Sequence, residues 1–324
     1  MTIVSNTFLT FSAKGLREEL SDVIYMISPE DTPVMSMMAK TRAKGTLQEW
    51  QTDVLGATDA SNAQLEGDDI ATYPSITPTV RVGNYQQISR KLLIISGTEE
   101  EVEKAGRRSE INYQTAMRGA ELKRDMETII CTPQPGNAGS STTARTTASL
   151  GAWLKTNVDK ASDGTNPSYT SGVPAMASGR GDGTARAFTE TILKSVLQKI
   201  WTATGDKPKY GFAGPFNKQA FSGFSGIATK TYYLNKPTAS PVVATADVYV
   251  GEFSVIEVLP DRFQRDRDFW ILNFDYLEIQ HLRPFRREDL AKTGDASKVM
   301  LLVEWGIKVR AESACGLAAD LATS

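Results

Sequence analysis

Apolar residues recur at every third or fourth position in three stretches of the chain, which is the spacing of an amphipathic helix. These stretches lie near residue 20, between residues 98 and 131, and between residues 188 and 205. The positions that mark the three faces are Leu16, Leu20, Val23, Ile24 and Ile27, then Ile111, Thr115, Leu122, Met126 and Ile129, then Phe188, Ile192, Val196 and Ile200. We expect a helix in each stretch, and a short fourth helix over PVMSMMAK that begins at the N-cap Thr32 and at Pro33.

The second stretch predicts one long helix from Thr98 to Cys131. Thr98 and Glu101 form a capping box at its start, and Gly106 and Gly119 soften the helix without ending it. A continuous helix over these residues would be on the order of 50 Å long. Its polar side carries the basic residues Arg107, Arg108, Arg118, Lys123 and Arg124.

Residues 46–91 predict a two-stranded ribbon that is poor in large apolar side chains. Its acidic residues all precede Arg81, and no Lys or Arg lies between Lys44 and Arg81. These acids are Glu49, Asp53, Asp59, Glu66, Asp68 and Asp69. Pro74 and Pro78 would each remove a ladder hydrogen bond, which favours an edge or a free ribbon. Because an isolated two-stranded ribbon is only marginally stable in water, we expect this one to lie on its own body or on a neighbour.

The remainder of the chain predicts loops and then strands. Residues 132–186 are dominated by Ser, Thr, Gly, Ala, Asn and Pro, which is typical of loop. After Gly205 the apolar runs shorten to the length of strands. The expected strands are KYGFAG, DVYVGEF, SVIEVLP, FWILNF, YLEIQHL and KVMLLVEWGIKVRAES. This order of elements predicts an α+β fold and not the regular alternation of a doubly wound sheet.

Composition and charge indicate an ordinary folded chain. It has 324 residues, of which 40% are hydrophobic and 23% charged, and a net charge of −2 gives no global reason for tight nucleic-acid binding. Cys131 and Cys315 are the only cysteines, so the sequence predicts neither a disulfide framework nor a thiolate metal set. The start, MTIVSNTFLTFSAKG, lacks the order of a signal peptide, and no apolar run reaches the length of a membrane span. We expect a soluble protein with free thiols in a reducing compartment.

Few residues suggest catalysis. His281 is the only histidine, so any Ser–His, Cys–His or His-cluster zinc arrangement would depend on this one residue. HExxH, GxSxG and Walker A motifs are absent from the sequence. Arg180-Gly181-Asp182 spells a cell-adhesion tripeptide, which we interpret as a turn. We therefore expect no enzymatic activity, metal or cofactor.

One group of charges requires a choice between two interpretations. PDRFQRDRDFW would place Asp266 and Asp268 on one face of a strand, with Arg265 and Arg267 on the other. A metal site favours carboxylates without cations beside them. The interleaved charges therefore favour a salt-bridged surface over a metal or acid–base site.

The short helix carries three methionines, Met35, Met37 and Met38. They are candidates for a soft docking surface between subunits. The simpler interpretation is that they fill the core, because methionine fills irregular gaps well.

In its order of elements the chain resembles the major capsid proteins of tailed phages, which have the HK97-like fold. EDTPVMSMMAK is similar to the short segment that precedes the extended loop (E-loop) in one branch of that family. The ribbon resembles the E-loop, and residues 98–131 resemble the long spine helix. The resemblance implies this division: 1–45 N-terminal arm, 46–92 E-loop, 93–131 peripheral domain with spine helix, 132–275 axial domain with a loop-rich insertion, and 276–324 return to the peripheral domain.

The resemblance also implies a function. Subunits would form the hexamers and pentamers of an icosahedral head shell that encloses double-stranded DNA, assembled in the host cytoplasm and found in the virion. The E-loop would lie across a neighbouring subunit. Its acidic residues Glu66, Asp68 and Asp69 would then face a basic acceptor, for which Arg107, Arg108 and Lys123 of the spine helix are candidates, and Arg81 is a further interface candidate.

Further partners follow from the same resemblance. They are a portal protein, a separate scaffolding protein, a possible decoration protein, and DNA in weak non-specific contact; a membrane is not among them. Some relatives crosslink a lysine of the E-loop to a neighbour, but here Lys44 and Lys91 lie at the base of the ribbon with no lysine between them, so we expect no such crosslink. Two alternatives stay open: the shell of an encapsulin-like nanocompartment, and a hydrolase with two convergent carboxylates.

Overall fold

The computed structural model describes residues 32–67, 73, 75–103, 108–174, 179–224 and 248–323. The helix expected near residue 20 lies outside these residues, as do Asp68, Asp69 and Arg107. The described chain contains helices and two larger sheets, of four and six strands. No helix in it has the length and apolar character needed to cross a membrane.

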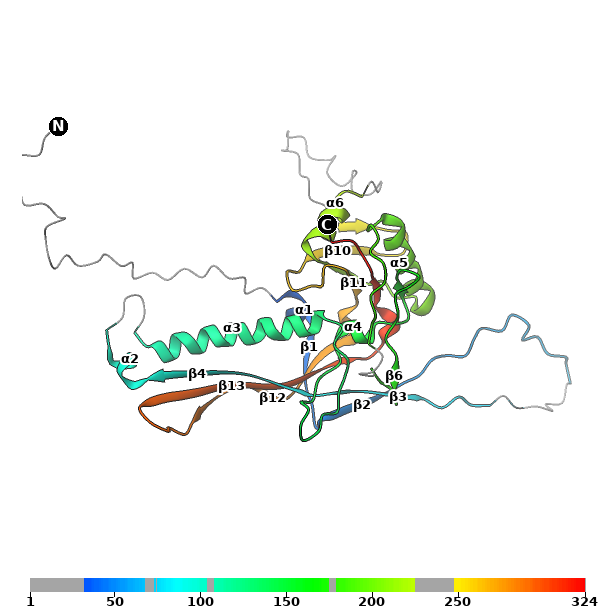
Figure 1. Ribbon diagram of the computed structural model, residues 1–324. Helices are drawn as coiled ribbons and strands as arrows, with labels where there is room; N and C mark the ends of the chain where they lie inside the picture. Colours follow the sequence, from blue (N-terminus) through cyan, green and yellow to red (C-terminus); the bar gives the residue numbers. More distant parts are fainter. Residues whose placement is uncertain are drawn as a thin grey trace, which may run out of the picture.

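The four-stranded sheet has the order β1-β12-β13-β4. Its strands are Ala39–Arg42 (β1), Leu277–Leu290 (β12), Ala296–Val309 (β13) and Gln87–Ser96 (β4). β12 and β13 form a long antiparallel hairpin, β4 adds to it antiparallel, and β1 pairs with β12 in parallel. Helix α3 lies along one face of this sheet (Figure 1), where Lys91 of β4 forms an ion pair with Asp125 of α3 at 2.6 Å.

The expectation of one continuous helix from Thr98 to Cys131 is wrong. The chain forms a short helix, Gly97–Glu101 (α2), and a separate helix, Glu110–Cys131 (α3). The expected capping box is also absent, because the hydroxyl of Ser96 accepts the cap hydrogen bond of α2. With 22 residues, α3 is about 33 Å long.

The physical reason for the break is a side chain that starts a second helix. The carboxylate of Glu100 accepts hydrogen bonds from the Ser109 hydroxyl at 2.6 Å and from the amides of Glu110 and Ile111 at 3.0 and 3.2 Å. The first amides of a helix have no partner within the helix, so a carboxylate at this end stabilises a new start.

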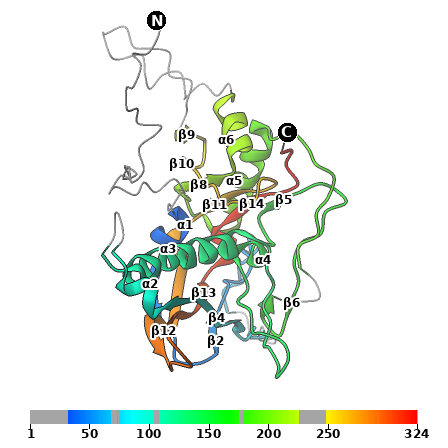
Figure 2. The ribbon, with the colours of Figure 1, turned by 60° about the vertical axis from the view of Figure 1, so that its left-hand side comes forward.

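The six-stranded sheet has the order β5-β14-β11-β8-β10-β9. Its strands are Val158–Asp159 (β5), Gly316–Ala318 (β14), Phe269–Leu272 (β11), Tyr210–Ala213 (β8), Val255–Pro260 (β10) and Val248–Val250 (β9). Helices Glu190–Thr204 (α5) and Pro215–Ser222 (α6) lie on this part of the molecule, away from β12 and β13 (Figure 2). The helix expected between residues 188 and 205 is therefore present, and it ends at Gly205 in the left-handed conformation.

Two hydrophobic cores pack the sheets against the helices and against each other. One lies between the six-stranded sheet and α5 and α6, and contains Leu193, Val196, Ile256 and Phe269. The other joins the two sheets, because it combines residues of α3 and β13 with residues of β11 and β14. Shorter elements contribute to it or border it: Pro33–Met37 (α1), Leu150–Trp153 (α4), Tyr169–Thr170 (β6), Val173–Pro174 (β7), Phe274–Tyr276 (η3) and Glu312–Ala314 (η4).

The ribbon is paired only at its base. Leu47–Thr52 (β2) and Val80–Tyr85 (β3) form an antiparallel pair from Leu47↔Tyr85 to Thr52↔Val80, whereas the chain from Gln87 onward belongs to the four-stranded sheet. We call residues 53–79 the distal loop; its described part contains neither helix nor strand. It projects from the base of the ribbon, away from the free end of the β12–β13 hairpin (Figure 1).

Asn84 of β3 fixes the base of the ribbon to the body. Its side chain is fully buried and donates to the carbonyls of Ala148 and Ile307 at 2.9 and 2.7 Å. The same amide group accepts hydrogen bonds from the amides of Ala148 and Tyr85, both at 2.8 Å. Every donor and acceptor of this buried amide is thus in use, which sets the direction in which the ribbon leaves the core.

We expect Asn84→Ala to lower the free energy of unfolding by about 2–4 kcal/mol, because each buried polar group left without a partner costs about 1–3 kcal/mol. Urea unfolding of the unassembled chain measures this change. Asn62→Ala, at an exposed position of the distal loop, is the matched control and is expected to change stability by less than about 0.5 kcal/mol. Equal effects of the two substitutions would contradict the role of Asn84.

Candidate assembly surfaces

The distal loop presents large apolar side chains directly to solvent. Val54, Leu55, Leu65, Tyr73 and Ile76 are 80–95% exposed. Monomeric soluble proteins rarely leave such a group uncovered, and an exposed apolar patch marks an interaction site. The loop is therefore the first candidate for a surface that another molecule covers.

A second apolar surface lies on β4, the last strand of the four-stranded sheet. Lys91 pairs with α3, so the alternation of the strand turns Ile88, Leu92 and Ile94 toward the opposite face. These three residues are 47–64% exposed. Met300 and Leu290 continue the face on β13 and β12, because Met300 pairs with Leu92, and Lys298 pairs with both Ile94 and Leu290. We call these five apolar residues the free sheet face.

A third apolar surface lies at the edge of the six-stranded sheet. Val248 and Val250 of β9 and Val255 of β10 are 45–54% exposed. Val255 pairs with Val250, and the face they share also carries Glu257 opposite Val248. Since β9 is the last strand of this sheet, its outer edge pairs with no strand among the described residues.

The interface residues predicted from sequence differ in their surroundings: some are exposed, and one forms an ion pair within the chain. Glu66 is exposed on the distal loop, and Arg81 forms an ion pair with Glu49 across the base of the ribbon at 3.1 Å. Arg108 and Lys123 are exposed.

The methionines of α1 face inward. Met35 and Met38 are 8% and 3% exposed and belong to the core that joins the sheets, and Met37 packs against that core. Met35 and Met38 are thus buried within their own chain, which removes them from the surfaces open to another subunit.

A buried acidic group anchors α1 to α3. The carboxylate of Glu127 accepts hydrogen bonds from the amides of Val34 and Met35 at 2.8 and 2.9 Å. It therefore caps α1, a role that the sequence assigned to Thr32; the Thr32 side chain makes no cap hydrogen bond. The cap links residues 93 positions apart, so no local pattern predicts it.

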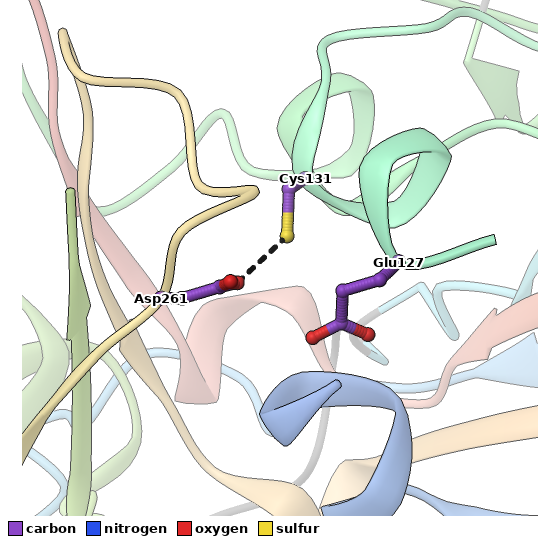
Figure 3. Close-up of side chains that lie close together, drawn as sticks. All are labelled: Glu127, Cys131 and Asp261. Carbon is purple, nitrogen blue, oxygen red and sulfur yellow. Dashed lines mark hydrogen bonds between the residues drawn. The ribbon is translucent and has the colours of Figure 1, made fainter. Parts of the chain in front are cut away.

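Glu127, Cys131 and Asp261 place three potential ligand atoms within 4.8 Å of one another (Figure 3). The Cys131 thiol donates to Asp261 at 3.3 Å, and burial, together with the carboxylates of Asp261 and Glu127, raises the pKa of Cys131 well above its ordinary value. A thiol must lose its proton to bind a metal. The thiol is a hydrogen-bond donor here and both oxygens of Glu127 hold α1, so this group fits a structural junction better than a metal centre.

The charges of PDRFQRDRDFW lie in a turn, which corrects the expected strand. β11 begins only at Phe269; Asp266 is exposed, whereas Asp268 is 1% exposed. The two acids therefore do not share a face. Arg265 pairs with Asp182 and, at 3.7 Å, with Asp268.

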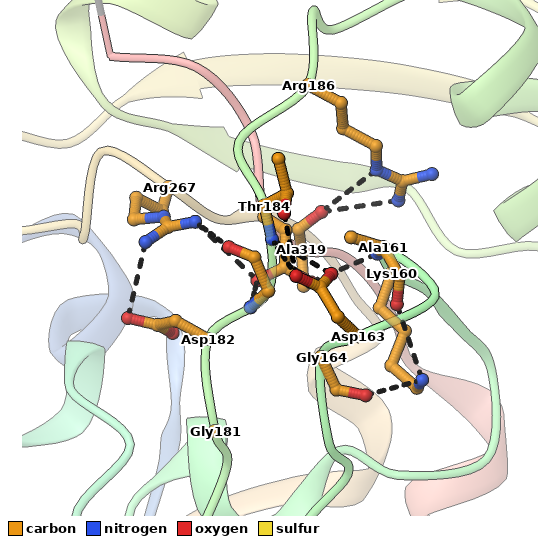
Figure 4. A network of polar contacts seen from close by, with 12 residues as sticks. Lys160, Ala161, Asp163, Gly164, Gly181, Asp182, Thr184, Arg186, Arg267 and Ala319 are labelled. Carbon is orange, nitrogen blue, oxygen red and sulfur yellow. Dashed lines mark hydrogen bonds and ion pairs between the residues drawn. The ribbon is translucent and has the colours of Figure 1, made fainter.

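The Arg180-Gly181-Asp182 tripeptide belongs to the same ionic network, of which Figure 4 shows the pair of Asp182 with Arg267. Asp182 pairs with Arg265 and, at 3.6 Å, with Arg267. Arg180 donates to the carbonyl of Leu154 at 2.7 Å. Both charged side chains of the tripeptide are thus held by their own chain, as expected for a structural turn.

Asp320 extends this network through backbone amides. It has a positive φ of 60°, and its carboxylate accepts hydrogen bonds from the amides of Ala161 and Gly183 at 3.0 and 2.7 Å. Nearby, Asp163 accepts from the hydroxyl and the amide of Thr184, which lowers the pKa of Asp163 (Figure 4). These carboxylates bind loops of the chain together.

His281 lies on β12, as expected. Its carbonyl accepts from the amide of Ala43 at 3.0 Å, and its ring lies 6.2 Å from the ring of Phe285. Burial and the nearby charge of Lys40 lower the pKa of His281. A neutral, half-buried imidazole in a strand fits a structural role.

Asp268 gives the fold a defined pH dependence. Burial raises its pKa to about 6, although Arg265 and Arg180 oppose the shift. An unfolded aspartate has a pKa of about 3.9, so the folded state binds this proton more tightly. Protonated Asp268 therefore stabilises the folded state below about pH 4, and this contribution to the free energy of unfolding is lost as the pH rises through about 6.

We expect the free energy of unfolding of the parent chain to fall by about 1–3 kcal/mol between about pH 4 and pH 6, as Asp268 loses its proton. In Asp268→Asn this fall should be absent, because the side chain no longer titrates. Urea unfolding of both chains across this range measures the difference. The exposed substitution Asp266→Asn is the matched control and should keep the profile of the parent. An unchanged profile in Asp268→Asn would contradict the assignment.

Comparisons with known proteins match the whole chain to phage capsid proteins. A model of the family described as SU10 major capsid protein matches residues 3–322. The major capsid protein of Escherichia phage Phieco32 is 26% identical over 341 residues, which is 96% of each chain.

Solved structures show the fold. A chain of the cyanophage A-1(L) capsid asymmetric unit superposes with a TM-score of 0.70 and 14% identity, covering 98% of this chain and 99% of that one. A chain of the SrpI encapsulin complex of Synechococcus elongatus superposes with a TM-score of 0.54 and 9% identity, covering 98% and 97%. The matches confirm the α+β, HK97-like fold that the order of elements predicts.

Proposed function

Since the chain belongs to the SU10 major capsid protein family, it is a structural protein that forms the shell of a phage head, and we propose that its distal loop assembles this shell by lying on a neighbouring copy. The main observation behind this proposal is the exposure of the loop. Its large apolar side chains are 80–95% accessible in the isolated chain. Burying each of them would contribute about 1.5–3 kcal/mol to association.

The anchoring of the ribbon supports the same role. Trp50 of β2 packs against Trp153 at a ring distance of 5.6 Å, and Asn84 holds β3 to the body. The loop therefore leaves the core in one direction, and less orientational freedom is lost when it reaches a partner. A loop of this kind serves a repeated contact between identical subunits.

The proposal extends to the composition of the particle. Copies assemble into hexamers and pentamers, with a portal protein, a separate scaffolding protein and in some particles a decoration protein. Double-stranded DNA inside the shell contacts the chain weakly and without sequence preference, because the net charge of −2 provides little attraction for phosphate.

The rival shell function, an encapsulin-like compartment, shares the fold but not the family match. The rival enzymatic function requires two free acids that converge in a cleft. The acids considered from sequence, Asp266 and Asp268, lie in different environments, and Asp268 is held by Arg265.

We expect replacement of residues 54–78 by a short Gly-Ser turn to abolish shells while leaving the fold intact, because the described residues among them belong to no strand or helix of the body. Negative-stain microscopy after size exclusion measures assembly, and circular dichroism measures folding. The matched control keeps the length of the loop and replaces Asn62 by Ala, an exposed polar change that should leave shells in place. Shells of normal yield from the shortened chain would contradict the proposal.

We also expect the particles to contain no covalent links between copies through the loop. Lys44 and Lys91 are the lysines nearest to it in the sequence; Lys44 precedes β2, and Lys91 lies on β4, where its ammonium pairs with Asp125 at 2.6 Å. A denaturing gel of mature particles should show monomer only. A ladder of multimers that resists boiling and reducing agent would refute this expectation.

A further inference from the structure

We propose that the tip of the β6–β7 hairpin, Ser171 and Gly172, is a stop that sets the direction in which the ribbon leaves the body, and that Gly172 is a positioning residue for shell assembly. We call these two residues the hairpin stop. This inference rests on the proposed function and deepens it, because the direction of the ribbon determines where its distal loop meets another copy. Three features support it: a contact between backbones, the anchoring of the hairpin, and the length of the ribbon.

The hairpin ends in a two-residue turn that presents its backbone at the tip. Thr170 pairs with Val173, and between them Ser171 and Gly172 have positive φ angles of 50° and 77°. Two consecutive residues of this kind form the tight turn that joins neighbouring antiparallel strands. Asparagine and aspartate also occur in such turns, so the turn by itself does not require a glycine at position 172.

The contact with the ribbon is what requires the glycine. The hairpin lies beside β3 at the base of the ribbon (Figure 1), and the Gly172 carbonyl accepts a hydrogen bond from the amide of Gly83 at 3.2 Å. A Cβ atom on Gly172 would lie 2.0 Å from the carbonyl oxygen of Arg81 and 2.9 Å from the Cα of Val82. These obstacles are backbone atoms, which no side-chain rotation can move. Any side chain at position 172 would therefore push the base of the ribbon away from the hairpin.

The hairpin can act as a stop because it is fixed to the body. The Tyr169 hydroxyl donates to the carbonyl of Trp153, and the two rings lie 5.3 Å apart in an edge-to-face arrangement. The ammonium of Lys155 lies 3.7 Å from the centre of the Tyr169 ring. On the other strand of the hairpin, the carbonyl of Pro174 accepts from the amide of Gly136 at 3.2 Å. Since Trp153 belongs to the core that joins the two sheets, the hairpin is anchored to that core.

The other strand of the ribbon rests on the same support. Trp50 of β2 packs against Trp153 at a ring distance of 5.6 Å. Trp153 thus contacts the ribbon through Trp50 and the hairpin through Tyr169. Asn84 fixes the end of β3 in the core, so the contact with Gly172 determines the remaining tilt of the ribbon.

The length of the ribbon turns a small change at its base into a large change at its tip. Relieving a 2.0 Å contact to an ordinary separation of 3.4 Å moves the base by about 1.4 Å, the difference between the two. A strand advances about 3.3 Å per residue, so the contact at Val82 lies about 7 Å from Asn84, and the middle of the distal loop lies several times farther away. The middle of the loop would therefore shift by on the order of 5–10 Å. A closely packed interface does not tolerate a displacement of this size.

The direction of the ribbon matters for assembly because the same contact is repeated in every copy. Contacts between unlike surfaces of identical subunits close into rings only when the rotation between neighbours allows it, and otherwise they give open polymers. A changed direction should therefore change which particles form without preventing the chain from folding.

Gly172→Ala tests the hairpin stop, and Gly205→Ala is its matched control. Gly205 has a similar φ of 71°, but a Cβ atom there would meet no other described part of the chain within 4 Å. Both substitutions impose the same kind of backbone strain, and only Gly172→Ala adds a collision with the ribbon.

The direction of the ribbon is measured in the unassembled chain by electron spin resonance. The spin labels are placed at two exposed positions, Asn62→Cys on the distal loop and Gln198→Cys on α5. Both natural cysteines are buried, so the introduced thiols take the labels. Negative-stain microscopy of chains without labels measures the diameter of the particles that form.

We expect Gly172→Ala to shift the distance between the labels by about 5 Å, and to replace normal shells by particles of other diameters or by open polymers. Gly205→Ala should keep the distance and the shells of the parent chain. An unchanged distance in Gly172→Ala would overturn the proposal, and so would a shifted distance together with shells of normal diameter.

Tyr169→Phe keeps the proposal testable if Gly172→Ala fails to fold. It adds no atom and removes only the hydroxyl that donates to Trp153. We expect a loosened stop, seen as a broader distribution of label distances and a mixture of particle diameters. Tyr276→Phe, which removes a hydroxyl bonded to Asp206, is the control and should behave like the parent chain. A distance distribution and shells like those of the parent in Tyr169→Phe would overturn the proposal.

These measurements separate the hairpin stop from the function proposed for the distal loop. If the chain with the shortened loop forms normal shells, the function proposed for the loop fails, even where the label distances show that Gly172 sets the direction of the ribbon. If shells require the loop but the label distance in Gly172→Ala is unchanged, the function proposed for the loop stands and only the stop is wrong.

Discussion

The constraint on which the structure depends is that the distal loop cannot bury its own apolar side chains. Val54, Leu55 and Ile76 are 88–95% exposed, and the strands that carry the loop pair only with each other. Nothing in a two-stranded ribbon supplies a second layer for them. The loop of the isolated chain therefore leaves apolar side chains uncovered, and the function proposed above assigns them to contact with another copy.

The rest of the chain provides the rigid body that such a contact needs. Trp270 and Leu317 of the six-stranded sheet share a core with Leu122 of α3 and Trp305 of the four-stranded sheet. Glu127 adds a polar connection by capping α1 from α3. This shared core joins both sheets and α3, and Asn84 fixes the base of the ribbon to it, so the loop leaves the body in one direction. A loop that leaves every copy in the same direction can make the same contact in every copy.

Local patterns predicted the elements well where local forces decide them. The strands of β8 to β13 follow their apolar runs, and α5 ends at Gly205 as a left-handed C-cap requires. The order of these elements was enough to indicate the fold. Long-range hydrogen bonds decided the positions that the sequence mispredicted. Glu100 starts α3 from outside the helix, and Glu127 caps α1 from a residue 93 positions away.

The candidate surfaces were predicted in part. The acidic, core-poor ribbon indicated a partner from its composition alone. The sheet face was not predicted, because the alternation of Ile88, Leu92 and Ile94 looks like that of any half-buried strand, and only the fold shows that α3 covers the other side. Met35 and Met38 show the converse, since residues typical of soft interfaces here fill a core.

The most direct test of the account is a reconstruction of assembled particles by electron cryomicroscopy. We expect rings of five and six copies in which residues 53–79 of each copy lie on the next copy. Density that shows the loop folded back on its own body would contradict the central claim.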